Sequence, residues 1–554
     1  MYVSCVWVKK VDEWVGLEVK VCVVEKGKRE FVIPDLVSVT HLKLTWLCID
    51  QSRFFTPHFH RVDLICSMSM ATPHFHSRIL VSLLFHFLLV FSYLLHTATA
   101  TQHHQEEDNP ITRFQRYLRI NTAHPTPDYS SAVSFLKAQA HLLGLTSKTI
   151  EYTPGKPLLL LTWPGSDLSL PSLLLNSHLD SVPAEPAKWL HPPFSAHRTP
   201  DGAVYARGAQ DDKCIAIQYL EAIRNLKARA FSPLRSVHIS LVPDEEIGGF
   251  DGAAKFVESD DFLRLNVGFA LDEGQASPGD DFRVFYADRV PWNVKIRAKG
   301  VPGHGARMYD GSAMENLMES VEVVSRFRES QFDVVKAGKA LNAEVVSVNP
   351  VYVKAGLPSD DGFVMNVQPS EAEAGFDLRL TPTTDPDEMR RRIAEEWAPA
   401  VRNMSYELAA KQMNEQLYQE ASLKKKNLRL KKLVSWITER KVALITEKGP
   451  IRDYMGRPIM TATNDSNPWW SVFKQAITSV GEKLSSPEIL GSTTDARYLR
   501  KKGIPVLGFS PMKNTPILLH DHNEHLKDTV FMNGIQVYES LISSLSTFTE
   551  ASAH

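Results

Sequence analysis

Short apolar runs alternate with amphipathic stretches from about residue 109 to residue 290. Apolar runs of strand length occupy 158–162, 173–176, 237–242 and 267–271, and helical periodicity occurs at 111–120, 132–143, 214–227 and 252–258. Asn109 and Pro110 add a helix N-cap followed by proline at the first helical position. Strands that alternate with helices predict an α/β fold in which helices cover both faces of a mostly parallel sheet.

The pattern changes after residue 291. Apolar and polar residues alternate at 292–298, 344–348 and 372–380, and charged helical patterns occupy 314–328 and 386–398. These elements predict an inserted α+β domain over 291–463. Because the earlier pattern returns over 464–550, the first predicted domain has two parts, 109–290 and 464–550.

Composition excludes several classes of protein. The 554 residues are 43% apolar and 23% charged, close to the globular average, so neither disorder nor a fibrous repeat is expected. A formal net charge of −2 offers no basic field for nucleic acid. Four of the five cysteines lie in the first 66 residues and only Cys214 lies beyond them, which excludes a disulfide scaffold for the rest of the chain.

Residues 70–100 have the layout of a secretory signal peptide. An apolar run over 78–95 is followed by small residues around Ala98 and Ala100, and translation from Met70 would place this segment at the chain start. Residues 1–69 would then be an upstream extension of doubtful status. In the secretory pathway, the sequons at Asn403 and Asn464 would be open to glycosylation. The mature chain would contain no membrane span. If translation starts at Met1, the apolar run would instead be a buried helix or a signal anchor. The alternative to the secretory pathway is a cytoplasmic location.

Residues 409–444 form a basic insertion. This segment holds seven lysines and two arginines against three glutamates, a net charge of +6. It separates 405–408 from 445–448, which would otherwise form one strand. The segment is compatible with an amphipathic helix that binds a membrane or an acidic partner, with a solvated helix, and with unspliced sequence.

Residue types that bind metal ions follow five apolar runs. They are His178 and Asp180, Asp211 and Asp212, the run Asp244-Glu245-Glu246, Asp272 and Glu273, and the run His520-Asp521-His522. Singly, most of these groups could be helix caps or structural hydrogen bonds. Together, at the carboxyl ends of strands in one sheet, they would share one crevice, where so many acids require cations. The oxygen and nitrogen ligands predict zinc, with manganese or cobalt as alternatives.

The strings ARGAQD, VPDEE, ALDEG, SNPWW, LGFSPM and LLHDHNE resemble those of the di-zinc aminoacylase and carboxypeptidase family of metallopeptidases. The resemblance extends from about residue 109 to residue 540, without 409–444. It is closer to the aminoacylases than to members that act on dipeptides or ornithine. It implies a catalytic domain with two zinc ions per subunit and an inserted lid domain that pairs two subunits into a homodimer.

The resemblance assigns the metal ligands by position. His178 and Glu273 would bind one zinc ion, and Glu246 and His520 would bind the other. Asp211 would bridge the two ions.

The remaining assignments concern catalysis and substrate binding. Glu245 would be the general base, and the Asp180 carboxylate would support the metal ligand His178. In the lid, His304 would reach the active site of the second subunit and donate a hydrogen bond as charge develops on the carbonyl oxygen. Asn366 and Arg379 would hold the substrate.

The function that the resemblance implies is zinc-dependent hydrolysis of N-acyl-L-amino acids to a carboxylate and a free L-amino acid. A metal-bridged water would be the nucleophile, and Glu245 would take its proton. The alternatives are a dipeptidase or an acetylornithine-type deacetylase with the same site. A further alternative is an inactive scaffold, if the 409–444 insertion disables the lid.

Overall fold

A computed structural model of the protein describes residues 5–7, 20–22, 40–42, 64–66, 108–409 and 452–549. The chain divides into two compact units, 1–105 and 106–554. In the first unit, strand β1 (Cys5–Trp7) pairs with β2 (Lys20–Cys22), and β3 (Thr40–Leu42) pairs with β4 (Leu64–Cys66).

Two of the predicted segments lie outside the described residues. They are the signal segment, 70–100, and the basic insertion, 409–444, apart from Ala409 at its start. Among the helices of the described ranges, none is long and apolar enough to cross a membrane.

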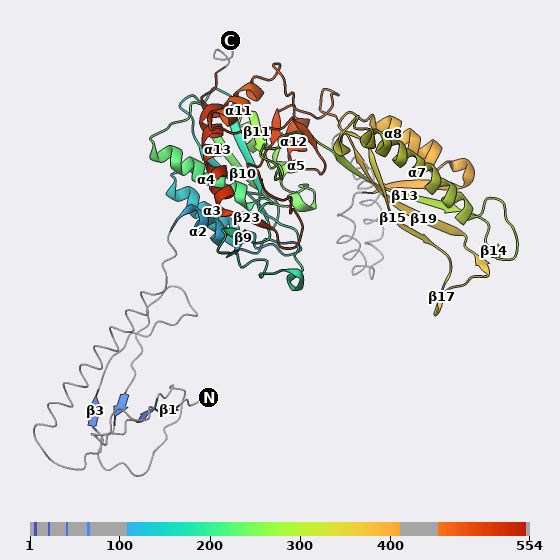
Figure 1. Cartoon of the computed structure of the whole chain (residues 1–554), viewed down its shortest axis with the longest axis horizontal. Coiled ribbons are helices and arrows are strands. Elements are labelled where there is room, and N and C mark those ends of the chain that lie inside the picture. The colour runs from blue at the N-terminus through green and yellow to red at the C-terminus, as the bar shows by residue number, and fades with distance from the viewer. Residues whose placement is uncertain are drawn as a thin grey trace, which may run out of the picture. The chain divides into compact units, whose positions relative to one another are not determined.

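An eight-stranded sheet forms the centre of the second unit (Figure 1). Its spatial order is β21 (Glu488–Leu490), β12 (Phe285–Asp288), β22 (Val506–Gly508), β11 (Val267–Asp272), β7 (Ser172–His178), β10 (Val237–Val242), β6 (Lys156–Trp163) and β5 (Thr146–Thr153). The pairs β22–β11, β11–β7, β7–β10 and β12–β21 are parallel, and the other three are antiparallel. The prediction of a mostly parallel sheet is confirmed.

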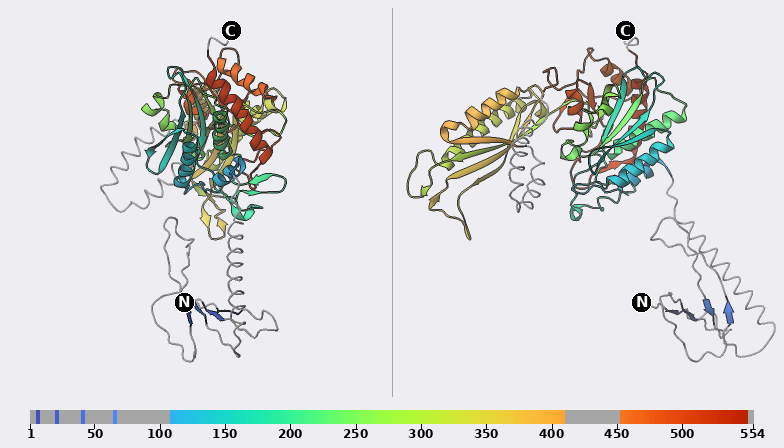
Figure 2. Two further views of the ribbon diagram at one scale, coloured as in Figure 1. Left: turned by 90° about the vertical axis from the view of Figure 1, so that its left-hand side faces the viewer. Right: turned by 180° about the vertical axis from the view of Figure 1, so that it is seen from behind.

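Helices cover both faces of this sheet because its central strands are apolar on both sides (Figure 2). In β6, Leu159 and Leu161 belong to one buried cluster and Leu158 and Leu160 to another, as side-chain alternation along a strand requires. The first cluster includes residues of α2 (Pro110–Leu118), α3 (Tyr129–Leu142), α4 (Lys213–Ala228), α11 (Pro468–Ser479) and α13 (Asp528–Thr547). The second includes residues of α5 (Ala253–Phe256), α6 (Asp260–Leu263) and α12 (Ala496–Lys501). The predicted α/β architecture is therefore confirmed.

A second, fully antiparallel sheet has its own hydrophobic core. Its order is β15 (Ser347–Ala355), β19 (Glu371–Leu380), β13 (Val290–Lys299) and β20 (Met404–Ala409). Residues of α7 (Ala313–Lys336), α8 (Pro386–Arg392) and the π-helical turn η4 (Ile393–Trp397) pack against it. Buried and half-buried residues alternate along β13, which matches the predicted strand pattern. The role of this part as a lid stays a prediction.

Several element boundaries differ from the prediction, and α7, for example, runs to Lys336 instead of ending at residue 328. Two further differences have a clear local cause. The pattern at 344–348 predicts a strand, but β15 begins only at Ser347, because Glu344 closes the 3-10 turn η3 (Asn342–Glu344) and accepts a hydrogen bond from the Leu341 N–H. The helix predicted over 252–258 is the four-residue α5, since Ser259 accepts a hydrogen bond from Phe262 N–H and starts the separate helix α6.

Candidate metal centre

Three neighbouring parallel strands of the large sheet end at the same edge. The last residue of β10, Val242, lies opposite His178, the last residue of β7, and β11 ends beside them at Asp272. After β10 the chain enters the 3-10 turn η2 (Glu245–Ile247). Asp244 starts this turn in a left-handed conformation (φ 63°), and its buried carboxylate accepts the N–H groups of Asp251 and Gly252.

Two loops from other parts of the chain reach the same edge. Asp211 follows β9 (Ala203–Tyr205) and directly precedes α4, whereas His520 precedes β23 (His525–Lys527). Because β9 pairs with β23 on one side and with β8 (His197–Arg198) on the other, the two loops lie together although about 300 residues separate them.

The predicted metal ligands converge on Asp211. Its Oδ1 lies 3.0 Å from His178 Nε2, and its Oδ2 lies 3.2 Å from His520 Nε2. His520 Nε2 is also 3.0 Å from Glu246 Oε2, and His178 Nε2 is 3.6 Å from Glu273 Oε2. One carboxylate therefore stands between two groups, each made of one histidine and one glutamate.

The donor set fits metal ions. Ligand atoms of His178, Asp211 and Glu246 lie within 4.8 Å of one another, and so do those of His178, Glu245 and Glu273. Glu246 Oε1 is buried without a hydrogen-bond partner among the described residues. Buried carboxylates that crowd together without enough donors require protons or cations, and imidazole and carboxylate are suitable ligands for zinc.

Burial and neighbouring charges shift the pKa values of the acids in the centre in different directions. Burial raises the pKa of Glu245 and of Glu273 well above the usual range, and neighbouring carboxylates raise both further. For Asp211, hydrogen bonds from His178 and His520 outweigh burial and hold the carboxyl pKa below its usual range. Hydrogen bonds to Asp211 and Glu246 raise the pKa of His520 to about 10. These shifts favour positive charge between the carboxylates, which metal ions would supply.

Asp180 makes more contacts than its predicted support of His178 requires. His178 Nδ1 lies 2.8 Å from the main-chain oxygen of Asp180 and 3.5 Å from its carboxylate. The carboxylate accepts hydrogen bonds from the main-chain N–H groups of Glu245 and Glu246, both at 3.1 Å, and contacts His124. Asp180 therefore orients His178 mainly through its backbone and holds the Glu245–Glu246 turn through its side chain.

Glu524 is a structural residue of the centre that the sequence reasoning did not single out. Its buried carboxylate accepts the main-chain N–H groups of Gly208, Gln210 and Asp211 and pairs with Arg207 Nη1 at 2.8 Å. Arg207 Nη2 in turn donates to the main-chain oxygen of His520. This buried pair joins the two ligand loops. The only signal for Glu524 in the sequence is its position two residues after the run His520-Asp521-His522.

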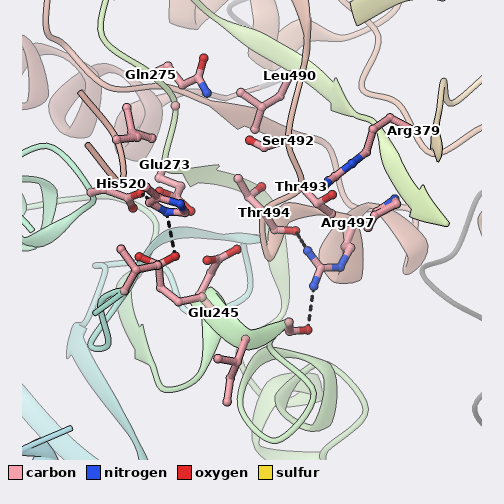
Figure 3. Close-up of a pocket in the computed structure, with 18 of the residues that line it drawn as sticks. Glu245, Glu273, Gln275, Arg379, Leu490, Ser492, Thr493, Thr494, Arg497 and His520 are labelled. Atoms are coloured by element: carbon pink, nitrogen blue, oxygen red, sulfur yellow. Dashed lines mark hydrogen bonds and ion pairs between the residues drawn. The ribbon is translucent and has the colours of Figure 1, made fainter. Parts of the chain in front are cut away.

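A cavity of about 550 Å³ opens beside the ligands. Figure 3 shows Glu245, Glu273 and His520 on one side and Arg379 on the other. Arg379, from β19, donates to Asp377 at 2.8 and 3.1 Å. Arg497 also lines the cavity, although no sequence motif indicated it, and its guanidinium donates to the main-chain oxygens of Thr494 and Gly248.

One predicted catalytic residue, His304, and one predicted substrate-binding residue, Asn366, lie elsewhere. His304 belongs to the two-residue strand β14 (Gly303–His304), which pairs with β18 (Val367–Gln368) next to Asn366. Both side chains are exposed, and neither lines the cavity. Within one chain, the structure therefore brings together the metal ligands, Glu245, Asp180 and Arg379, but not His304 and Asn366.

Relatives of known function resemble most of this chain. Aminoacylase-1 of Mus musculus is 39% identical over 448 residues, which make up 81% of this chain and 98% of the relative. Aminoacylase-1 of Homo sapiens is 38% identical over 444 residues, 80% of this chain and 97% of the relative.

Solved structures with this fold include two peptidases. Aminopeptidase PepT from Bacillus cereus has a TM-score of 0.54 at 14% identity, over 79% of this chain and 98% of that chain. The dipeptidase Dug1p from Saccharomyces cerevisiae has a TM-score of 0.53 at 14% identity, over 79% and 95%. At such identities the similarity shows the fold alone. The sequence profile of Peptidase family M20/M25/M40 matches residues 174–544, and with relatives matched over nearly their whole length, the chain belongs to this family and is a metal-dependent amidohydrolase.

Proposed function

We propose that the protein hydrolyses N-acyl-L-amino acids to a carboxylate and a free L-amino acid, with two zinc ions in its metal centre. The observation that carries the proposal is the position of Asp211, whose two oxygens face His178 and His520. The aminoacylase-1 relatives, 38–39% identical over about four fifths of the chain, favour this reaction over peptide hydrolysis.

The ligand geometry supports two ions that share one carboxylate. His178, Asp211 and Glu273 would hold one ion, and Asp211, Glu246 and His520 the other. Bound zinc ions supply Lewis acidity towards an amide carbonyl and towards water. Cobalt and manganese accept the same ligand types, so zinc is the part of the proposal that a metal assay must test.

Glu245 is the proposed general base. Its carboxylate oxygen lies within 4.8 Å of ligand atoms of His178 and Glu273, and the ligand assignment leaves it without an ion to bind. It would accept a proton from the attacking water and deliver it to the leaving amine. The hydrogen bond from its main-chain N–H to Asp180 keeps the turn in place during both transfers.

Arg379 is the proposed partner of the substrate carboxylate. It lines the cavity opposite the ligands, and its planar guanidinium matches a carboxylate through two parallel hydrogen bonds. A substrate would have to share this guanidinium with Asp377, its present partner.

His304 and Asn366 are proposed to serve the active site of a second subunit. Strand β15 supports a homodimer because it lies at the edge of the second sheet, where its backbone can pair with another strand. Val351 and Val353 of β15 are 66% and 59% exposed, which is unusual for apolar residues of a strand unless a partner covers them.

The test is hydrolysis of N-acetyl-L-methionine by the full chain, with and without added zinc, beside its Glu245→Gln variant. We expect zinc-dependent release of methionine, and in the variant a kcat lower by about 10²- to 10⁴-fold, the usual contribution of a general base. The zinc content of the variant should equal that of the wild type, because Glu245 binds no ion in the proposed site.

Loss of zinc together with activity in Glu245→Gln would instead make Glu245 a ligand. Parallel assays with a dipeptide and with N-acetylornithine separate the alternative reactions. Faster turnover of either one would contradict the proposed substrate class.

A further inference from the structure

The buried carboxylate of Asp180 receives a side-chain hydrogen bond from a residue that lies outside the metal centre. His124 Nε2 is 2.8 Å from Asp180 Oδ2, and the His124 side chain is only 13% exposed. An ionised carboxylate can only accept, so the Nε2–H of His124 is the donor. Hydrogen bonds to a buried charge are stronger than neutral ones and costly to lose.

The backbone holds this imidazole in place. His124 follows α2 in a segment that runs beside the residue after Asp180, with an isolated parallel bridge between Ala123 and Ser181. The His124 N–H donates to the Ser181 oxygen at 3.0 Å, and the Ser181 N–H donates to the Thr122 oxygen at 3.0 Å. Two backbone hydrogen bonds with Ser181 therefore fix the segment that carries His124.

Asp180 transmits this contact to two parts of the centre. Its carboxylate accepts the N–H groups of Glu245 and Glu246, and its main-chain oxygen meets His178 Nδ1. In the described part of the chain, His124 and His178 are the side chains within salt-bridge distance of the Asp180 carboxylate. Without His124, the Asp180 carboxylate would be free to rotate towards the His178 ring, 3.5 Å away. The N–H groups of Glu245 and Glu246 would then lose their hydrogen-bond acceptor.

We propose that His124 is a positioning residue of the metal centre. Its hydrogen bond fixes the Asp180 carboxylate in the one orientation that holds the Glu245–Glu246 turn over the strand ends. His124 does not line the cavity, so it acts through Asp180 and not on substrate. The inference rests on the proposed function for its kinetic consequences, whereas its effect on metal binding is independent of the substrate.

Two substitutions separate the hydrogen bond from the volume of the ring. His124→Leu keeps a side chain of similar bulk without a donor, and His124→Gln keeps an amide donor that reaches Asp180. Zinc affinity is measured by competition with a chromogenic chelator, and kcat and KM are measured on N-acetyl-L-methionine, all with the full chain.

His238→Gln is the matched control. His238 is also a buried histidine with one hydrogen bond, to Thr162 Oγ1 at 2.9 Å, but it lies within the large sheet and contacts no ligand. We expect His238→Gln to leave zinc affinity and kcat at the wild-type values.

We expect His124→Leu to lower zinc affinity by about 10- to 100-fold, the usual effect of removing a group that orients a ligand, and to lower kcat without raising KM. His124→Gln should recover most of both losses. If His124→Leu does not fold, His124→Met, which also lacks a donor and has a more adaptable side chain, should show the same loss of zinc affinity.

Wild-type zinc affinity and kcat in His124→Leu, or in His124→Met where it replaces the leucine variant, would overturn the proposal. Equal losses in the leucine and glutamine variants would also overturn it, because the ring volume would then be what matters. Failure of the proposed function gives a different result. The wild-type protein would then bind zinc without releasing methionine, and the zinc affinities of the variants would still decide the role of His124.

Discussion

Neighbouring acids of the metal centre differ in their surroundings more than in their residue type. Asp180 and Glu245 are both acids near strand ends. Hydrogen bonds from His124 and His178 outweigh the burial of Asp180 and lower its pKa to about 2, whereas burial without such donors raises the pKa of Glu245. An acid that must stay ionised therefore lies among donors, and an acid that must exchange a proton does not.

His238 provides a prediction about stability and pH. Burial lowers its pKa from 6.5 to about 4, so the folded chain keeps this imidazole neutral while the unfolded chain takes up a proton as the pH falls below about 6.5. The stabilising contribution is complete above that pH and is lost between about 6.5 and 4. We expect the difference in unfolding free energy between pH 7 and pH 5 to be smaller by about 2 kcal/mol in His238→Gln than in the wild type.

Urea unfolding of both proteins at the two pH values measures this difference. Metal-free protein should be used throughout, so that loss of zinc at low pH does not add to the result. Identical pH dependence in the two proteins would mean that His238 is protonated in the folded chain.

At the scale of elements, local signals in the sequence define how several helices begin. Asn109 caps α2 by a capping box with Thr112, and Ser312 caps α7 by a capping box with Glu315. The side chain of Ser312 accepts the Glu315 N–H at 3.3 Å, and Glu315 Oε2 accepts the N–H groups of Ser312 and Gly311. The 24-residue helix α7 covers the second sheet, so its first turn matters to the whole of that core.

Ser312→Ala removes one acceptor of this capping box. We expect the free energy of unfolding to fall by about 1 kcal/mol, the usual cost of losing a serine N-cap. Ser330→Ala is the control, because Ser330 lies on the same helix and its hydroxyl donates to the oxygen of Phe327, one turn earlier. Chemical unfolding followed by circular dichroism should show a clear loss for Ser312→Ala alone. Equal stability of both variants would indicate that Glu315 and water satisfy the first turn without Ser312.

At the scale of the whole molecule, two residues proposed for the active site lie away from the cavity of their own chain. The ligands and Glu245 lie at the edge of the large sheet, whereas His304 belongs to β14 and Asn366 directly precedes β18, and neither lines the cavity. The apolar edge strand β15 offers a surface for a second copy. A homodimer would allow His304 of one copy to serve the cavity of the other.

Mixing two inactive variants tests this arrangement. His304→Ala and Glu245→Gln should each show little turnover of N-acetyl-L-methionine. After equimolar mixing and exchange of subunits, half of the dimers are mixed, and each mixed dimer contains one site with both wild-type residues. We therefore expect about a quarter of the wild-type rate, by the symmetry of a dimer with two equivalent sites.

Mixtures that stay as inactive as their components, although subunit exchange is demonstrated, would place His304 in the site of its own chain or outside catalysis. Dilution of the wild type below its dimer dissociation constant should lower the rate per subunit. A constant rate across that dilution would contradict the need for a second copy.

The sequence by itself determined the elements and the chemical groups, because both depend on local patterns. Apolar runs with period two, helix caps such as Asn109, and acids directly after buried strands are visible without any contact map. They were sufficient for the α/β class, for the edge of the sheet at which residue types that bind metal gather, and for the five groups of such residues, whereas the ligand set around Asp211 came from the family resemblance.

Only the tertiary structure decided which of these groups meet and what each contact does. His520 reaches Asp211 across about 300 residues because β9 and β23 pair. The contacts of Glu524 and His124 likewise join loops that are distant in the chain, and no local pattern encodes such a pair. The opposite pKa shifts of Asp180 and Glu245 also belong to the packed molecule, because burial raises the pKa of both acids and only Asp180 receives hydrogen bonds from His124 and His178 that outweigh it.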